Sequence, residues 1–236
     1  IHPPKLFDLV AKEIRTYGGK ILTNHQVISI KQTNNSISSI VVSHNGVKNN
    51  IECDGIINAA GPWSDKVAKL INQNVELQLT RGCGIFFTGQ LVSKAINRCR
   101  IPNNNDIMCP SGKESLWGTT SEVVNNPDTS KTSPDEIQEL LLGAEELFPN
   151  IRNYKSFRTW SGVRPLVKPK NINNTLPLPR SHLVIDHEGM GLNFFLTVCG
   201  GALTTHRLMA EDVVNNLGNK FGIDIACSSH TTPLLN

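Results

Sequence analysis

The stretch that decides the fold is Leu192–Leu217, LNFFLTVCGGALTTHRLMAEDVVNNL. Its first part, Asn193–Val198, is a short apolar run rich in β-forming residues, which is typical of a buried strand. Gly200-Gly201 follows, and paired glycines let the backbone turn sharply and approach another group closely. The side-chain oxygens of Thr204 and Thr205 can cap the first free N–H groups of a helix. The stretch therefore predicts a buried strand, a glycine turn and a helix.

The helix of this unit is expected to carry one apolar stripe and to end at Gly218. The stripe consists of residues at or near helical spacing: Leu208, Met209, Val213, Val214 and Leu217. A strand, glycine turn and helix in this order aim partly positive N–H groups at one point, which suits an anion or a cofactor. An ordinary tight β–α connection gives the same pattern, so the stretch is consistent with either role.

Composition limits the class of protein. The chain has 236 residues, 39% of them hydrophobic and 18% charged, which predicts a globular fold of one large or two small domains. The net charge of +3 is too small and too scattered to indicate nucleic-acid binding. No apolar run approaches the roughly 20 residues of a membrane span. The cysteines and histidines show no metal-ligand spacing, so we expect no metal site, and we expect no disulfide.

The order of elements predicts an α+β, or mixed α/β, chain. In the first part we expect a helix over Lys5–Tyr17, strands over Ile21–Ile30, Ile37–Ser43, Val47–Cys53 and Ile56–Ala60, and a helix over Trp63–Ile71. Asn45-Gly46 between two of these strands is a strong hairpin signal.

The middle and the end of the chain continue in the same way. We expect strands over Leu77–Phe87, Asp106–Pro110, Leu116–Thr120, Phe157–Val167 with a bend at Gly162, Leu183–Asp186 and Leu192–Val198, and a loop over Pro169–Pro179. Ser133-Pro134-Asp135-Glu136 is a capping box that begins a helix, to which we assign a structural role. The predicted division is residues 1–74, 75–160 and 161–236, with the middle part as a lobe of its own.

Two further positions suit ligand binding. Asn58–Trp63, NAAGPW, places small residues and a glycine at a strand end, where a flat ring or a pyrophosphate can lie against the backbone. A tightly packed β–α corner is the alternative. Arg164 lies in SGVRPLV, and a guanidinium binds phosphate or carboxylate through two parallel hydrogen bonds. A surface salt bridge is the other explanation for this arginine.

Five motifs together resemble the FAD-dependent glycerol-3-phosphate dehydrogenases, and most of all the flavin-bearing subunit of the anaerobic enzyme. They are NAAGPW, RGCG, INRCRIPNNNDIMCPSGKESLWGTTS, SGVRPLV and CGGALTTHRLMAED, within about residues 3–220. The third motif is the most specific, because generic fold physics demands little of it. NAAG alone occurs widely in D-amino-acid-oxidase-like flavoproteins.

This resemblance implies part of a Rossmann-like FAD-binding domain, in residues 1–74 and 161–236, and a substrate-capping domain on an antiparallel sheet, in residues 75–160. The implied reaction is hydride transfer from sn-glycerol 3-phosphate to FAD, which gives dihydroxyacetone phosphate. The electrons then pass to a quinone through partner subunits. The resemblance further implies a cytoplasmic protein, peripheral to the inner face of the cell membrane, and is compatible with a homodimer.

The resemblance also assigns site residues. The expected cofactor contacts are Val27 on the adenine side, Ala60, Gly61, Trp63, Gly200, Gly201, Leu203 and Thr204. The expected substrate contacts are Arg164, Thr204 and Thr205. Arg164 is the expected catalytic position, because it matches the arginine that holds the substrate near the flavin ring.

Several departures from the family pattern shape these expectations. The chain has no G-x-G-x-x-G, so we expect an N-terminally truncated piece that alone binds FAD weakly or not at all and is inactive. Ala202 stands where the family usually has lysine, and His206 replaces a common tyrosine. Two alternatives therefore stay open. The chain could belong to a flavoenzyme acting on a 2-hydroxy acid or an amine, or it could be a catalytically inactive interaction module.

Overall fold

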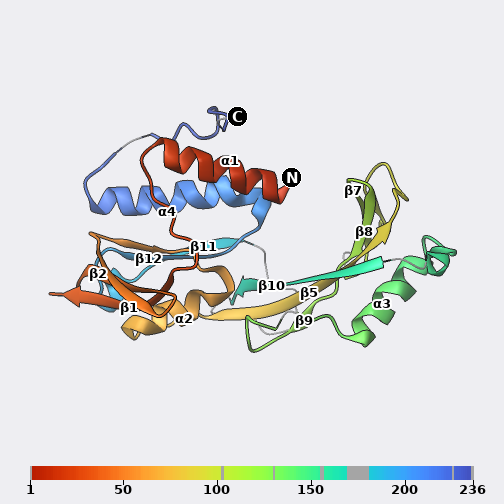
Figure 1. Ribbon diagram of the computed structural model, residues 1–236, viewed down its shortest axis with the longest axis horizontal. Helices are drawn as coiled ribbons and strands as arrows, with labels where there is room; N and C mark the ends of the chain where they lie inside the picture. Colours follow the sequence, from red (N-terminus) through yellow and green to blue (C-terminus); the bar gives the residue numbers. More distant parts are fainter. Residues whose placement is uncertain are drawn as a thin grey trace. The chain divides into compact units, whose positions relative to one another are not determined.

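The computed structural model describes residues 2–101, 104–129, 131–154, 157–168, 181–224 and 226–234, and its elements are labelled in Figure 1. The chain forms two compact units, Ile1–Glu76 with Val167–Asn236, and Leu77–Leu166. Both combine helices with sheets that are largely antiparallel, which confirms the predicted mixed α/β class. The loop expected over Pro169–Pro179 lies outside the described residues.

The first unit holds two three-stranded sheets. Its elements are α1 (Pro3–Thr16), β1 (Gln26–Thr33), β2 (Ser36–His44), β3 (Val47–Glu52), β4 (Ile56–Asn58), η1 (Gly61–Trp63), α2 (Ser64–Ala68), η2 (Lys69–Ile71), β11 (His182–Asp186), η4 (Glu188–Met190), β12 (Phe195–Gly200), η5 (Leu203–Thr205) and α4 (His206–Lys220). One sheet is the antiparallel meander β1-β2-β3; in the other, β12 is antiparallel to β11 and parallel to β4.

Helix α4 covers one face of the β11-β12-β4 sheet (Figure 1). Val213 is buried against Leu196 and Val198 of β12, and Met209 and Leu217 pack onto the same cluster. The predicted apolar stripe is thus confirmed for Met209, Val213 and Leu217, which are spaced four residues apart. It is wrong for Leu208 and Val214, which are 45% and 57% exposed. Each lies about 100° around the helix from a stripe residue, so neither faces the sheet.

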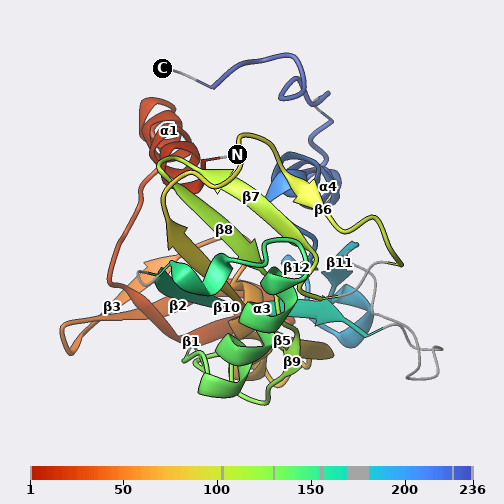
Figure 2. The same ribbon diagram turned by 90° about the vertical axis from the view of Figure 1, so that its right-hand side faces the viewer.

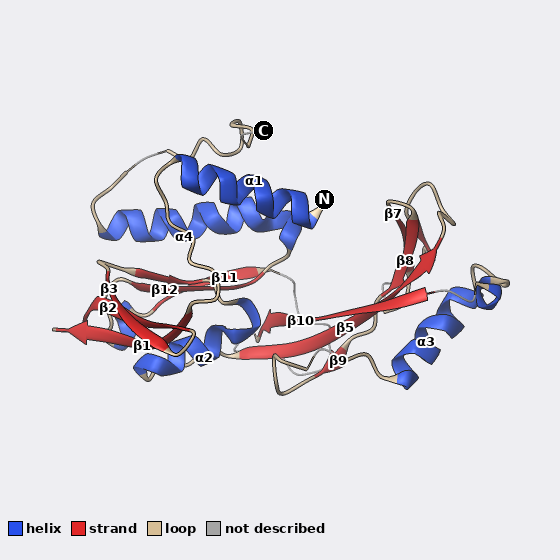
Figure 3. Ribbon diagram, in the orientation of Figure 1, coloured by secondary structure: helices blue, strands red, loops and turns tan. Residues whose placement is uncertain are grey.

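The second unit is built on a six-stranded sheet of order β10-β5-β8-β7-β6, with β9 paired to β5. The elements are β5 (Leu77–Thr88), β6 (Ile96–Asn97), β7 (Ile107–Ser111), β8 (Glu114–Gly118), β9 (Glu122–Val123), α3 (Pro134–Glu145), η3 (Ile151–Asn153) and β10 (Phe157–Val167). Figure 3 labels strands β5, β7, β8, β9 and β10 of this unit, and Figure 2 also labels β6. Helix α3 packs against β5 and β8 (Figure 2), and Trp117, Phe87 and Leu140 are fully buried in the shared core.

Local signals in the sequence set several of these elements. Asn45 and Gly46 both adopt positive φ, 50° and 81°, as a tight hairpin turn requires, and they join β2 to β3 as predicted. Ser133 accepts a hydrogen bond from the backbone N–H of Glu136 (3.2 Å), and Glu136 accepts one from the N–H of Ser133 (2.9 Å). The predicted capping box is therefore confirmed.

Other boundaries differ from the prediction. Strand β1 begins at Gln26 rather than Ile21, because Asn24 has a positive φ of 58° in the turn before it. The helix expected over Trp63–Ile71 is only the five residues of α2 between two 3-10 turns. The bend expected at Gly162 is wrong, since β10 continues through it while pairing with β5 in the sheet.

The end predicted for α4 at Gly218 is also wrong, because the helix continues to Lys220. Gly222, with a φ of 66°, supplies the left-handed residue after the helix. The N–H of Gly222 donates to the O of Asn219 (3.2 Å), and the N–H of Ile223 donates to the O of Gly218 (2.9 Å). These two bonds satisfy the last carbonyls of the helix, so the stop signal lies at Gly222 rather than at Gly218.

Among the described residues no helix combines the length and apolarity needed to cross a bilayer. Across the same residues, no cluster of three or more His, Cys, Asp or Glu side chains could hold a metal ion. All six cysteines are free thiols.

Candidate functional site

Two glycine turns leave the same edge of the β11-β12-β4 sheet. Strands β4 and β12 run parallel, with Ile56, Ile57 and Asn58 opposite Phe195, Leu196 and Thr197. Their carboxyl ends therefore point the same way, one toward the turn at Gly61 and the other toward Gly200-Gly201. The carboxyl ends of parallel strands are the usual place for a ligand in sheets of this kind.

A buried polar network joins the two strands just before these turns. Nδ2 of Asn58 donates to the O of Ser64 (2.9 Å) and to Oγ1 of Thr197 (3.2 Å), while Oδ1 of Asn58 accepts from the N–H of Ala60 (3.3 Å). On the other side of Thr197, Nε2 of His187 lies 3.0 Å from Oγ1. His187 and Thr197 are completely buried, and burial lowers the pKa of His187. The network fixes the first glycine turn onto β12.

The Gly200-Gly201 turn has a backbone shape that only glycine adopts easily. Both φ angles are positive, 74° and 69°. An added Cβ at Gly200 would lie 2.5 Å from the carbonyl O of Ser181, and one at Gly201 would lie 2.5 Å from Sδ of Met209. Close packing of this turn within its own unit is therefore enough to require both glycines.

The predicted capping by threonine is wrong. The 3-10 turn η5 comes before α4, and no side chain caps α4. Oγ1 of Thr205 instead turns back, where it accepts from the N–H of Ala202 (3.2 Å) and donates to the O of Ala202 (2.9 Å). Because η5 leads directly into α4, the N–H of His206 donates to the O of Leu203 and is not free for a ligand. The N–H groups that lack an acceptor within a helical segment are those of its first turn, which here is η5.

The other cofactor positions lie around these turns or in the meander. Gly61 has a φ of 55°, and an added Cβ there would meet nothing within 4 Å, so the backbone is open to a close approach. Trp63 is 42% exposed and Leu203 is 36% exposed. Val27 belongs to β1 of the separate meander sheet, opposite Val42, and not to the sheet that carries the two turns.

Arg164 lies on β10 in the other unit, half-buried. Nη2 of its guanidinium donates to Oγ1 of Thr119 (2.8 Å), and Nη1 donates to the O of Thr120 (3.3 Å). The guanidinium lies over Gly82 of β5, where an added Cβ would come within 2.0 Å of Nη2. Any other residue at Gly82 would therefore displace the guanidinium, which explains the glycine of the RGCG motif.

Thr119 and Thr120, which hold Arg164, were not predicted as site residues, and Glu136 was predicted only as part of a helix cap. Glu136 is buried and also contacts Thr120, with 3.0 Å between Oγ1 and Oε1. The sequence signal that could have indicated Thr119 and Thr120 is the GTTS end of the most specific motif, because a strand or turn in general does not require their two hydroxyl groups.

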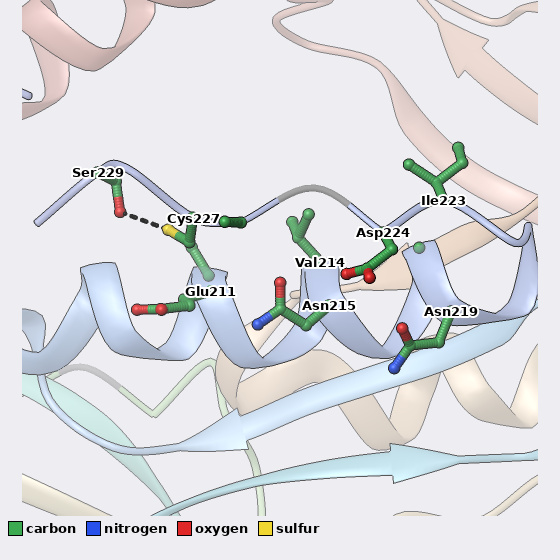
Figure 4. A pocket seen from close by; sticks show the side chains of 11 residues that line it. Glu211, Val214, Asn215, Asn219, Ile223, Asp224, Cys227 and Ser229 are labelled. Atoms are coloured by element: carbon green, nitrogen blue, oxygen red, sulfur yellow. Dashed lines mark hydrogen bonds between the residues drawn. The ribbon is translucent and has the colours of Figure 1, made fainter.

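Two cavities lined by described residues of the first unit are larger than a third one beside Phe194, which is about 210 Å³. The larger, about 740 Å³, follows the outer edge of β11 and includes His182, whose Nε2 lies 2.6 Å from Oδ2 of Asp212 on α4. The other, about 590 Å³, lies between the outer face of α4 and the chain that follows it (Figure 4). Val214 of α4 faces this second space, and Sγ of Cys227 lies 3.0 Å from Oγ of Ser229 at one end. None of the sequence-predicted site residues is among the described residues that line either cavity.

The profile of one protein family, described as FAD dependent oxidoreductase (DAO), matches residues 1–215. The chain belongs to this family. The A subunit of the anaerobic glycerol-3-phosphate dehydrogenase of Escherichia coli (strain K12) is 30% identical over 222 residues, covering 92% of this chain and 41% of the relative. The A1 subunit of the enzyme of the same name from Haloferax volcanii is 27% identical over 232 residues, covering 92% and 40%. These relatives confirm the resemblance, and the chain spans about 40% of their length.

The fold of this chain is similar, over most of its length, to that of a solved structure. The glycerol-3-phosphate dehydrogenase from Bacillus halodurans complexed with FAD superposes with a TM-score of 0.75 at 19% identity, covering 94% of this chain and 43% of that one. At this identity the similarity establishes the fold. The described chain thus has the fold of part of that structure.

Proposed function

We propose that this chain supplies the substrate-binding arginine and part of the flavin site of an FAD-dependent glycerol-3-phosphate dehydrogenase. The observation that carries the proposal is the position of the Arg164 guanidinium. It donates hydrogen bonds to Thr119 and Thr120 and lies over the backbone of Gly82, which has no side chain. A guanidinium fixed in this way is oriented before a ligand arrives, which reduces the entropy lost on binding. Its fork of donors suits the phosphate of glycerol 3-phosphate.

FAD, when bound, would accept the hydride taken from the substrate. Gly61, Gly200, Gly201 and Leu203 would then lie along the cofactor, with the backbone N–H groups at the start of η5 facing its negative edge. The open backbone at Gly61 supports this assignment. Val27, Ala60 and Trp63 are further proposed cofactor contacts, and Thr204 and Thr205 are proposed to face the flavin and the substrate.

The wider setting of the reaction is part of the same proposal. Electrons would pass to a quinone through partner subunits, and the parent enzyme would be cytoplasmic and peripheral to the inner membrane face. The names of the relatives support partner subunits, because each name designates one lettered subunit of an anaerobic dehydrogenase. This chain alone would retain FAD weakly or not at all, and the protein's absorbance near ~450 nm after desalting would measure that.

Isothermal titration calorimetry of the chain with sn-glycerol 3-phosphate measures the dissociation constant and tests the role of Arg164. Arg164→Met is expected to weaken binding by roughly 10- to 150-fold, because a charge-assisted hydrogen bond contributes about 1.5–3 kcal/mol. Arg158→Met is the matched control, since Arg158 lies on the same strand and pairs with Glu114 on the surface (2.6 Å). Equal loss in the two variants would contradict the proposal.

The same titration with lactate and glycine separates the alternative substrates. Ala202, which stands where the family usually has lysine, is the reason to include a 2-hydroxy acid and an amine. Binding of lactate or glycine without binding of glycerol 3-phosphate would replace the proposed substrate. An absence of binding for all three would favour the interaction module.

A further inference from the structure

The segment that holds Arg164 is itself fixed from several directions. The O of Thr119 accepts from the N–H of Asn105 (2.9 Å). The N–H of Thr120 donates to the O of Cys83 (3.0 Å), and Oγ1 of Thr120 accepts from the N–H of Cys83 (2.9 Å). Thr120 is buried, with 2% of its surface exposed. These bonds to β5 and to the loop before β7 fix the peptide group between Thr119 and Thr120 and the side chain of Thr120, beside the two oxygens that accept from Arg164.

A buried carboxylate completes this arrangement. Oε1 of Glu136 accepts from Oγ1 of Thr120 (3.0 Å) and from Sγ of Cys83 (3.1 Å). Oε2 accepts from Nη2 of Arg81 (2.7 Å) and from the N–H of Ser133 (2.9 Å). Since the Thr120 hydroxyl accepts from Cys83 and donates to Glu136, both of its roles are assigned and its rotation is locked.

The ionised form of Glu136 is the one this environment favours. Burial by itself raises the pKa of the carboxyl, but the hydrogen bonds from Ser133, Cys83 and Thr120 and the charge of Arg81 outweigh it, so the pKa lies below its ordinary value. Arg81 is in turn held by the O of Lys131 (2.6 Å) and by a contact with Glu122. Only 7% of each residue in the Arg81–Glu136 pair is exposed.

This pair is more than a helix cap needs. A capping box works with a surface glutamate, and a buried ion pair often costs as much in lost hydration as it gains in attraction. Here the carboxylate also contacts Thr120, which belongs to the segment whose oxygens accept from the guanidinium. We propose that Glu136 is a positioning residue for Arg164: through the Thr120 hydroxyl it fixes the Thr119–Thr120 segment on which the substrate-binding guanidinium rests.

This inference rests on the proposed function only for its link to substrate, because the geometry of Arg164 can be measured without any ligand. The probe is the Nε–H signal of Arg164 in a ¹⁵N–¹H NMR spectrum of the whole chain, assigned by its loss in Arg164→Lys. The variant is Glu136→Gln, and the matched control is Glu139→Gln on the exposed side of the same helix. Thr120→Val removes the linking hydroxyl, whereas Thr120→Ser keeps it.

We expect Glu136→Gln and Thr120→Val to shift and broaden the Arg164 signal, and to weaken sn-glycerol 3-phosphate binding roughly tenfold, as for one lost hydrogen bond. Glu139→Gln is expected to leave both unchanged, and Thr120→Ser, which keeps the linking hydroxyl, is expected to restore the signal and the binding that Thr120→Val loses. A purely structural Glu136 would lower the melting temperature without moving the Arg164 signal, and that result overturns the inference.

Two outcomes keep this test separate from that of the proposed function. If Glu136→Gln does not fold, the contrast between Thr120→Val and Thr120→Ser decides, and equal Arg164 signals in those two variants would overturn the inference. If the native chain binds no glycerol 3-phosphate but the Arg164 signal responds as expected, the positioning role stands and the proposed substrate fails.

Discussion

Replacing Thr197 by valine tests whether the buried network really joins the two glycine turns. Valine keeps the shape of the side chain and removes the hydroxyl, which lies 3.2 Å from Nδ2 of Asn58 and 3.0 Å from Nε2 of His187. Two buried hydrogen bonds are lost, each contributing about 1 kcal/mol, and the two partners are left unsatisfied. We expect the free energy of unfolding to fall by about 2–3 kcal/mol, or about 4–12 °C in Tm for a chain of this size.

The measurement has to report on the unit that contains Thr197. Hydrogen exchange of the β12 amides does so, because it gives the opening free energy of that region separately from the rest of the chain. Thr33→Val is the matched control, since Thr33 ends β1 as an exposed residue. If Thr197→Val lowers protection of β12 no more than Thr33→Val does, the network does not stabilise this edge of the sheet and the reasoning is refuted.

Three further changes have expected outcomes. Gly200→Ala forces a positive φ on alanine and brings its Cβ within 2.5 Å of the O of Ser181; we expect a loss of about 1–3 kcal/mol from backbone strain alone in urea unfolding, whereas Gly189→Ala, which meets nothing within 4 Å, should change little. Leu140→Ala empties a fully buried position, and the same assay should show a loss of about 2–5 kcal/mol. Burial lowers the pKa of His187 below its ordinary 6.5, so as the pH falls the unfolded chain binds a proton on this histidine before the folded chain does. The free energy of unfolding should therefore fall as the pH drops through about 6.5 and level off below the folded pKa. His187→Gln should remove that part of the pH dependence in the same assay, and an unchanged pH profile of the variant would contradict the prediction.

Short-range chemistry in the sequence determined much of the fold. Asn45-Gly46 fixed a hairpin because both residues tolerate positive φ, and the Ser133 capping box fixed the start of α3 because its partners are three residues apart. The apolar run before Gly200-Gly201 predicted a buried strand for the same local reason. The family motifs, read from the residues alone, were enough to identify the DAO flavoprotein family.

The tertiary structure decided what depends on partners far along the chain. Whether Val213 or Val214 is buried follows from the side of α4 that faces β12, which spacing within the helix does not reveal. Gly162 remains in a strand because β5, a strand from much earlier in the chain, pairs with β10. The residues that surround the Arg164 guanidinium likewise come from β5, β10, the start of α3 and the segment after β8. Only the folded chain therefore brings Glu136 close to the oxygens that accept from Arg164.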